Sequence, residues 1–198
     1  MAAAVNPAGE LSIIGSTGFG EAAERLRAVT VQVITATRAG AGFGSGVLWS
    51  ANGLVITNAH VASRGRVVVV FQNGSRYEAV VAGADGQHDL AALQIRGAVF
   101  SPAAVRDSAT LRVGELVIAM GNPRGEIGAV TAGMVHRVGQ GSLIETDVHL
   151  APGNSGGPLA DSEGRVLGVN SCIVNGLGIA IGSRAIQAFV ARLVSAKN

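Results

Sequence analysis

The residue whose setting most suggests chemistry is Ser155, in the stretch LAPGNSGGPLAD at 150–161. Gly153 lies two residues before it and Gly156 directly after it. Such a stretch is typical of a tight turn, because glycine adopts backbone conformations that other residues avoid. It is also typical of a nucleophile, because backbone N–H groups with no side chains around them can stabilise an oxyanion. The partners that the rest of the sequence offers decide between these interpretations.

A serine hydroxyl becomes a nucleophile when a base takes its proton and a carboxylate orients that base. His60, in VITNAHV, and Asp89, in GQHDLAAL, precede Ser155 in the order His, Asp, Ser. Alone, each has an ordinary structural explanation: a histidine at a strand end, an aspartate in a turn, a serine in a turn. Together and in this order, they predict a charge-assisted triad of the kind carried by a pair of β-barrels.

Two other motifs fail on their context. Residues 153–157 fit G-x-S-x-G, but in α/β-hydrolases the histidine follows the serine and a helix begins at it. Here all four histidines precede Ser155, and they are His60, His88, His136 and His149. The glycine-rich stretch at 40–46 lacks the Lys-Ser/Thr ending of a phosphate-binding loop and runs into a strand, so we interpret it as a turn.

The elements expected around these residues are mostly strands. Val- and Ile-rich runs bounded by Gly, Asn and Ser predict strands at 28–36, 44–50, 53–58, 66–72, 76–83, 88–95, 115–120, 128–137, 142–147, 157–160, 165–171 and 177–181. A short helix is expected at 20–27, and helical spacing predicts another at 183–196 with Ser183 as its N-cap. Strands do not alternate with helices, so the fold class predicted is all-β, with two barrels or sandwiches.

Composition excludes several classes of function. The chain has 198 residues, 48% of them hydrophobic and 14% charged, with a net charge of +2 and no basic tract that would indicate nucleic acid. No apolar run is long enough for a membrane helix. The single cysteine, Cys172, has no partner for a disulfide or a zinc site, and its apolar surroundings predict a buried small side chain. We expect no metal and no cofactor.

Longer stretches of the sequence resemble the trypsin-like serine proteases of the HtrA (Deg) type. The resemblance covers about residues 22–196. It is carried by GSGVLWSANGLVITNAHV, HDLAALQI, IAMGNPRG, TDVHLAPGNSGGPLADSEGRVLGVNS and GLGIAIGSRAI.

This resemblance implies a chymotrypsin-like double β-barrel with a C-terminal helix, acting as a serine endopeptidase on unfolded or damaged polypeptides. Residues 1–21 would be an N-terminal arm and 22–198 the protease domain. That domain would comprise a first barrel at about 22–98, a second at about 112–182 and a helix at about 183–196. Ser155 would attack the scissile carbonyl, His60 would act as base and then acid, and Asp89 would orient His60.

The resemblance also implies a binding site around the triad. The oxyanion hole would comprise the N–H groups of Gly153 and Ser155, with Asn154 between them. The wall of the S1 pocket would lie at Asn170, Ser171 and Cys172, and His149 sits six residues before Ser155. A small or medium aliphatic P1 residue is the expectation, with an acidic or polar P1 as the alternative if His149 points into the pocket.

Regulation, assembly and location rest on the resemblance alone. Glycine-rich loops near 122–129 and 138–153 would become ordered on activation, and Phe19 would anchor a homotrimer. HtrA proteins carry PDZ domains after the protease, so this chain resembles the protease domain without one. No signal peptide is evident, which as written predicts the cytoplasm, whereas the family is usually exported.

Two rivals to a protease stay open: a binding module that kept only the fold, and an esterase with the same triad.

Overall fold

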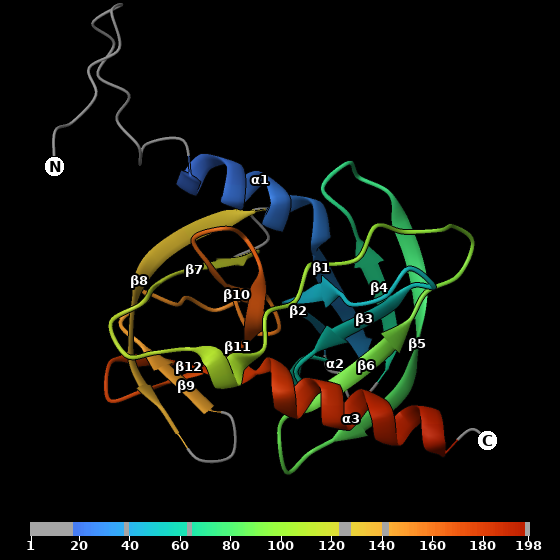
Figure 1. Cartoon of the computed structure of the whole chain (residues 1–198). Coiled ribbons are helices and arrows are strands. Elements are labelled where there is room, and N and C mark those ends of the chain that lie inside the picture. The colour runs from blue at the N-terminus through green and yellow to red at the C-terminus, as the bar shows by residue number, and fades with distance from the viewer. Residues whose placement is uncertain (1–17, 38–39, 63–64, 123–127, 140–142, 197–198) are drawn as a thin grey trace, which may run out of the picture.

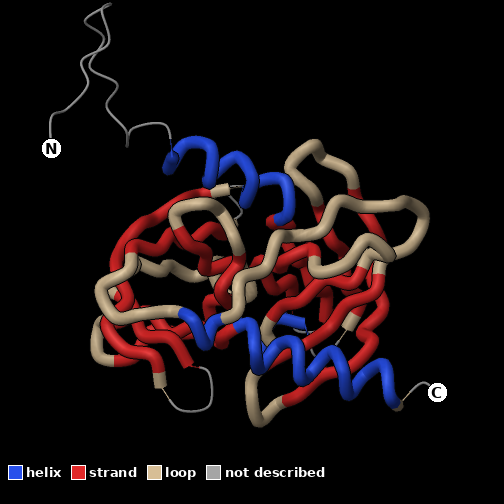
Figure 2. Tube along the Cα trace, viewed as in Figure 1, coloured by secondary structure: helices blue, strands red, loops and turns tan. Residues whose placement is uncertain are grey.

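Two closed barrels make up most of the molecule in the computed structural model (Figures 1 and 2). The structure describes residues 18–37, 40–62, 65–122, 128–139 and 143–196. Every strand neighbour within each barrel is antiparallel. The predicted all-β, chymotrypsin-like fold class with a C-terminal helix is therefore confirmed.

The first barrel has the closed strand order β1-β2-β3-β6-β5-β4. Its strands are β1 (Thr30–Thr37), β2 (Gly40–Leu48), β3 (Leu54–Thr57), β4 (Arg66–Val70), β5 (Arg76–Asp85) and β6 (Leu90–Gln94). A single-turn helix, α2 (Ala59–Ala62), follows β3. The predicted strand at 88–95 is shorter in the structure, because the residues before Leu90 form a turn.

The second barrel has the closed order β10-β11-β12-β9-β8-β7. Its strands are β7 (Leu116–Gly121), β8 (Ala129–Val138), β9 (Leu143–Thr146), β10 (Pro158–Asp161), β11 (Val166–Val174) and β12 (Leu177–Gly182). The connection between the barrels contains a 3-10 turn, η1 (Ser108–Thr110).

Two longer helices flank the barrels, α1 (Gly18–Val29) before the first and α3 (Ser183–Ser195) after the second. In Figure 1, α1 lies above the second barrel and runs down to β1 of the first, and α3 crosses from the second barrel to the first. The prediction that Ser183 caps α3 is wrong, because Gly182 is the N-cap. The Ser183 hydroxyl instead donates to Arg106 O and accepts from Ser108 N, which ties the start of α3 to the inter-barrel connection.

Three hydrophobic cores hold these parts together. One fills each barrel, and the third lies between the barrels and includes α1 and α3. Neighbouring residues of one strand enter different cores: on β3, Val55 lies inside the first barrel and Ile56 in the shared core. Side chains alternate along a strand, so a strand with both faces buried is mostly apolar, although β1 also buries Thr30 and Gln32. The shared core fixes one barrel against the other.

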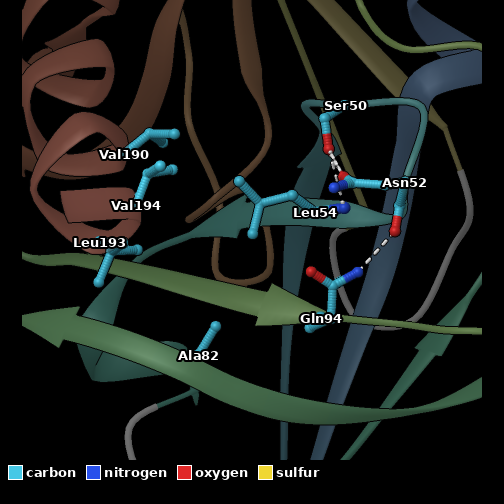
Figure 3. A pocket seen from close by; sticks show the side chains of 8 residues that line it. All are labelled: Ser50, Asn52, Leu54, Ala82, Gln94, Val190, Leu193 and Val194. Atoms are coloured by element: carbon cyan, nitrogen blue, oxygen red, sulfur yellow. Dashed lines mark hydrogen bonds between the residues drawn. The ribbon is translucent and has the colours of Figure 1, made fainter. Parts of the chain in front are cut away.

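A hollow of about 410 Å³ remains where α3 crosses the first barrel (Figure 3). Val190, Leu193 and Val194 of α3 face Leu54 across it. On its polar side, Gln94 Nε2 donates to the carbonyl oxygen of Asn52 at 2.6 Å. None of the residues predicted to be catalytic lines this hollow, so it is a feature of helix packing rather than of the candidate site.

A half-buried ion-pair cluster fastens the inter-barrel connection to the second barrel. Arg106 Nη1 lies 2.7 Å from Glu115 Oε2 and 3.5 Å from Asp161 Oδ2. Hydrogen bonding from Arg106 lowers the pKa of Glu115 to about 2 from its ordinary 4.5, and Arg112 adds to the effect while partial burial opposes it. Glu115 therefore stabilises the fold only while it is ionised.

Replacing Glu115 by Gln is expected to lower the free energy of unfolding at neutral pH by about 1–3 kcal/mol, the range for a hydrogen bond to a charged group. The folded-state pKa lies below the unfolded one, so this contribution is present above about pH 4.5 and is lost as the pH falls toward about 2. Urea denaturation of both proteins across that range measures it. A difference that stays constant down to the lowest pH would contradict the assignment.

Candidate active site

The geometry joins His60 to Asp89. His60 lies on α2, directly after β3, and Asp89 lies in the turn between β5 and β6. The His60 Nδ1 atom is 2.8 Å from Asp89 Oδ2 and 3.0 Å from Oδ1, and the His60 backbone N–H donates to Oδ1 at 3.1 Å. About half of the His60 side chain is exposed. Its Nδ1 side is thus fixed on the carboxylate while the ring stays accessible.

Asp89 is held in an uncommon backbone conformation, with φ of 52°. Side chains other than glycine rarely adopt this region, so the surroundings must hold it. The Asp89 carbonyl oxygen accepts from the N–H of Ala59 at 3.2 Å and from Asn58 Nδ2 at 3.0 Å. The expectation that Asp89 continues a strand from His88 is wrong, because both lie in the turn. His88 pairs instead with Asp85, its Nδ1 lying 2.9 Å from Oδ2.

Ser155 reaches the same place from the second barrel. Its Oγ donates to the carbonyl oxygen of Ser171 at 2.9 Å, and the Ser171 hydroxyl donates to Asp89 Oδ2 at 2.7 Å. Among the residues that the structure describes, no hydrogen bond links the Ser155 hydroxyl to the His60 ring. Ser171 therefore connects the serine to the carboxylate, and sequence reasoning assigned it only to the S1 wall.

A β-bulge turns Ser171 toward Asp89. In the pairing of β11 with β12, Asn170 lies opposite Ala180 and Cys172 opposite Ile179, so Ser171 is the extra residue. Bulges redirect side chains and often occur beside active sites. The apolar run around 166–174 carries no sign of this extra residue, so the sequence predicts the strand but not the bulge.

Two backbone N–H groups beside the serine are free. Among the described residues, the N–H groups of Gly153 and Ser155 have no acceptor, whereas Asn154 N donates to Ala151 O and Gly156 N to Asn170 O. Asn154 is buried, and its Oδ1 has no hydrogen-bond partner. The N–H of Asn154 is thus already hydrogen-bonded. The N–H groups of Gly153 and Ser155, which the sequence suggested, are available to an oxyanion.

Glycine at position 156 lets the serine loop meet the first barrel. Gly156 has φ of 85°, and a Cβ on it would lie 2.1 Å from Ser45 O and 2.3 Å from Thr57 Oγ1. These atoms belong to β2 and β3, and β3 leads to His60. The glycines that first suggested a turn therefore bring the loop against the strands that carry the rest of the site.

The residues predicted for the S1 wall have separate surroundings. Ser171 and Cys172 line a hollow of about 490 Å³ together with His88 and Asp89, and neither His149 nor Asn170 lines it. Asn170 is buried, with Nδ2 donating to Gly157 O and Pro158 O, and His149 is exposed.

The prediction that Cys172 is buried is wrong. Residues 171–174 of β11 extend beyond the segment that pairs with β10, so the thiol is left exposed.

The remaining histidine lies on the surface. His136 is exposed on β8, and its Nε2 lies 3.3 Å from Oδ2 of Asp147, which is exposed just after β9. A hydrogen bond from the Met134 N–H is the main cause that holds the pKa of Asp147 below its usual value, and a hydrogen bond from His136 lowers this pKa further. Within the described ranges, no group of three or more His, Cys, Asp and Glu side chains is arranged to hold a metal ion.

Comparison with known proteins decides the family. Residues 44–169 match the sequence profile of the trypsin-like peptidase domain. The chain belongs to the trypsin-like peptidase family. It is 39% identical over 148 residues to a DegP-like periplasmic serine endoprotease of Chlamydia pneumoniae, covering 70% of this chain and 30% of that protein. It is also 39% identical over 162 residues to the human serine protease HTRA4, covering 75% and 34%.

Solved structures agree with this assignment. The chain superposes on a serine endoprotease from Yersinia pestis with a TM-score of 0.83 and 30% identity, covering 89% of this chain and 66% of that one. The HtrA-type protease AlgW, in a structure with a tripeptide, gives a TM-score of 0.84 at 28% identity, covering 89% and 63%. The resemblance to HtrA proteases is thus confirmed. The chain spans about a third of the length of these curated relatives.

Proposed function

We propose that this peptidase is a serine endopeptidase that cleaves unfolded or damaged polypeptides with Ser155 as nucleophile, His60 as acid–base and Asp89 as its orienting carboxylate. The observation that carries the proposal is the contact of His60 Nδ1 with Asp89, with Ser155 joined to the same carboxylate through Ser171. The named endoproteases among its relatives support the same class of reaction.

The reaction begins when the Ser155 hydroxyl rotates from Ser171 O toward His60. Ser155 Oγ attacks the scissile carbonyl carbon as His60 Nε2 takes its proton, and Asp89 stabilises the imidazolium through Nδ1. The negative oxygen of the tetrahedral intermediate accepts from the free N–H groups of Gly153 and Ser155. His60 then protonates the leaving amine, and water hydrolyses the acyl-enzyme by the same proton transfers.

An extended chain is the substrate form that fits. Beyond Val169, β11 is paired with β12 on one side, and the described residues provide no strand on its other side. A polypeptide can add to that edge by main-chain hydrogen bonds, which requires it to be unfolded locally. The exposed Cys172, Ile173 and Val174 lie along this edge, and an aliphatic P1 residue remains the expectation for the S1 pocket.

Export and assembly follow only by analogy. The DegP-like relatives are named periplasmic, so we propose an exported enzyme. No helix in the described ranges is long and apolar enough to cross a membrane. Phe19 on α1 is 39% exposed, and we retain it as the proposed anchor of a homotrimer. Parts of the two loops proposed to become ordered on activation lie outside the described residues: 123–127 of the first and 140–142 of the second.

Fluorescently labelled casein, a largely unfolded protein, tests the function. We expect its cleavage into peptides with new N-termini, faster than that of a compact folded protein at equal concentration. Turnover of an ester substrate without peptide-bond cleavage would favour the esterase. A folded chain that cleaves neither and does not react with a fluorophosphonate would favour the binding module.

A further inference from the structure

Ser45 of β2 lies completely buried where the two barrels meet. Its hydroxyl donates to the carbonyl oxygen of Gly153 at 2.7 Å. It accepts from the backbone N–H of Asn122 at 2.9 Å and from Asn122 Nδ2 at 3.1 Å. A residue of the first barrel is thus bonded to the loop that carries the nucleophile of the second.

The proton of the Ser45 hydroxyl points toward the carbonyl oxygen of Gly153. A serine hydroxyl has one donor and two acceptor positions, and Asn122 occupies both acceptor positions. Asn122 is itself fixed, because its Nδ2 also donates to Val31 O at 2.9 Å and its Oδ1 accepts from Gly128 N at 3.1 Å. The bond to Gly153 O therefore satisfies the donor of this buried hydroxyl.

The backbone of Ser45 holds the other side of the nucleophile. Its N–H donates to Ser155 O at 2.8 Å, and its carbonyl oxygen accepts from Thr57 Oγ1 at 2.7 Å. The carbonyl groups of Gly153 and Ser155 are thus both fixed by one residue. The peptide between them, from Asn154 to Ser155, carries the N–H of Ser155, and Gly153 is held at φ of 104°.

We propose that Ser45 is a positioning residue of the oxyanion hole: its hydroxyl fixes the Gly153 carbonyl so that the free N–H groups of Gly153 and Ser155 meet the developing oxyanion. This inference rests on the proposed function. It means that removing the Ser45 hydroxyl weakens stabilisation of the transition state. Removing a buried hydrogen bond elsewhere in the fold would not have this effect. Misplacement of such groups by about 1 Å can cost about 100-fold in rate.

The test compares Ser45→Ala with Ser183→Ala. Ser183 is equally buried, and its hydroxyl also donates to a backbone carbonyl and accepts a backbone N–H. Both variants are expected to lose thermal stability, but only Ser45→Ala should lower kcat, by about 10- to 100-fold, with KM unchanged. Affinity for a peptidyl boronate, whose tetrahedral adduct resembles the transition state, should fall by the same factor as kcat/KM.

Equal kcat values for wild type and a folded Ser45→Ala variant would overturn the proposal, as would an equal loss in Ser183→Ala. If Ser45→Ala does not fold, the pair Ser45→Cys and Ser183→Cys replaces it. A thiol is somewhat larger than a hydroxyl at both positions and is only a weak donor, so kcat should again fall only at position 45. A wild-type chain that cleaves nothing would remove the proposed function and this inference with it, whereas an active wild type with an equally active Ser45 variant would remove this inference alone.

Discussion

Replacing Ser155 by Ala is expected to lower kcat by about 10⁶-fold, the order of loss found when the nucleophile of a serine-protease triad is removed. The substitution deletes the atom proposed to form the acyl-enzyme. The fold should survive, since Ser155 Oγ makes one hydrogen bond, to Ser171 O, from a partly exposed position. Rates of casein cleavage and covalent labelling by a fluorophosphonate measure the effect.

The matched control for this prediction is Ser162→Ala, at an exposed serine between β10 and β11. It should cleave and label as the wild type does. Binding of a peptide to Ser155→Ala should be retained, because the deleted atom contributes to the reaction and not to the edge of β11. Cleavage that persists in Ser155→Ala would place the nucleophile elsewhere.

Replacing Asp89 by Asn is also expected to have a large effect and to lower kcat by about 10⁴-fold. Both carboxylate oxygens lie within 3.0 Å of His60 Nδ1. An amide that turns its NH₂ group to Nδ1 stabilises the wrong tautomer, and a neutral amide cannot stabilise the imidazolium that forms when Ser155 is deprotonated. Steady-state kinetics across the neutral pH range measure the loss.

Asp107→Asn is the control for the same chemical change. The Asp107 carboxylate accepts from Ala109 N at the start of η1, and an amide oxygen can do the same. Its kcat should equal that of the wild type. Asp89→Asn with near-wild-type kcat would show that His60 needs no charged partner, which would exclude the proposed triad.

Local patterns in the sequence predicted the strands well, because both faces of most strands are buried. Alternate residues enter a barrel core or the shared core, as Val55 and Ile56 do, so apolar runs coincide with strands. The nearness of His60 to Asp89 was predicted only through their order and flanking motifs. It depends on a turn in which Asp89 takes a positive φ, and nothing in the residue itself indicates that conformation.

Features that depend on distant partners could not be predicted in this way. The bulge at Ser171 arises from the register between β11 and β12. The hydroxyl of Ser183 was predicted to cap a helix, but Arg106 and Ser108 compete for it. Ser45 lies 77 positions from Asn122 and 108 from Gly153, so its short glycine-flanked motif gives no indication of the contacts it makes.

The division of the site between two barrels has a consequence for damaged copies of the enzyme itself. His60 and Asp89 come from one barrel and Ser155 from the other, and Ser45 and the shared core join the two. A molecule whose barrels have separated has lost its catalytic alignment and has become an exposed chain of the kind that the proposed activity degrades. On the proposed activity, the same structural failure would inactivate a copy under heat stress and make it a substrate of intact ones.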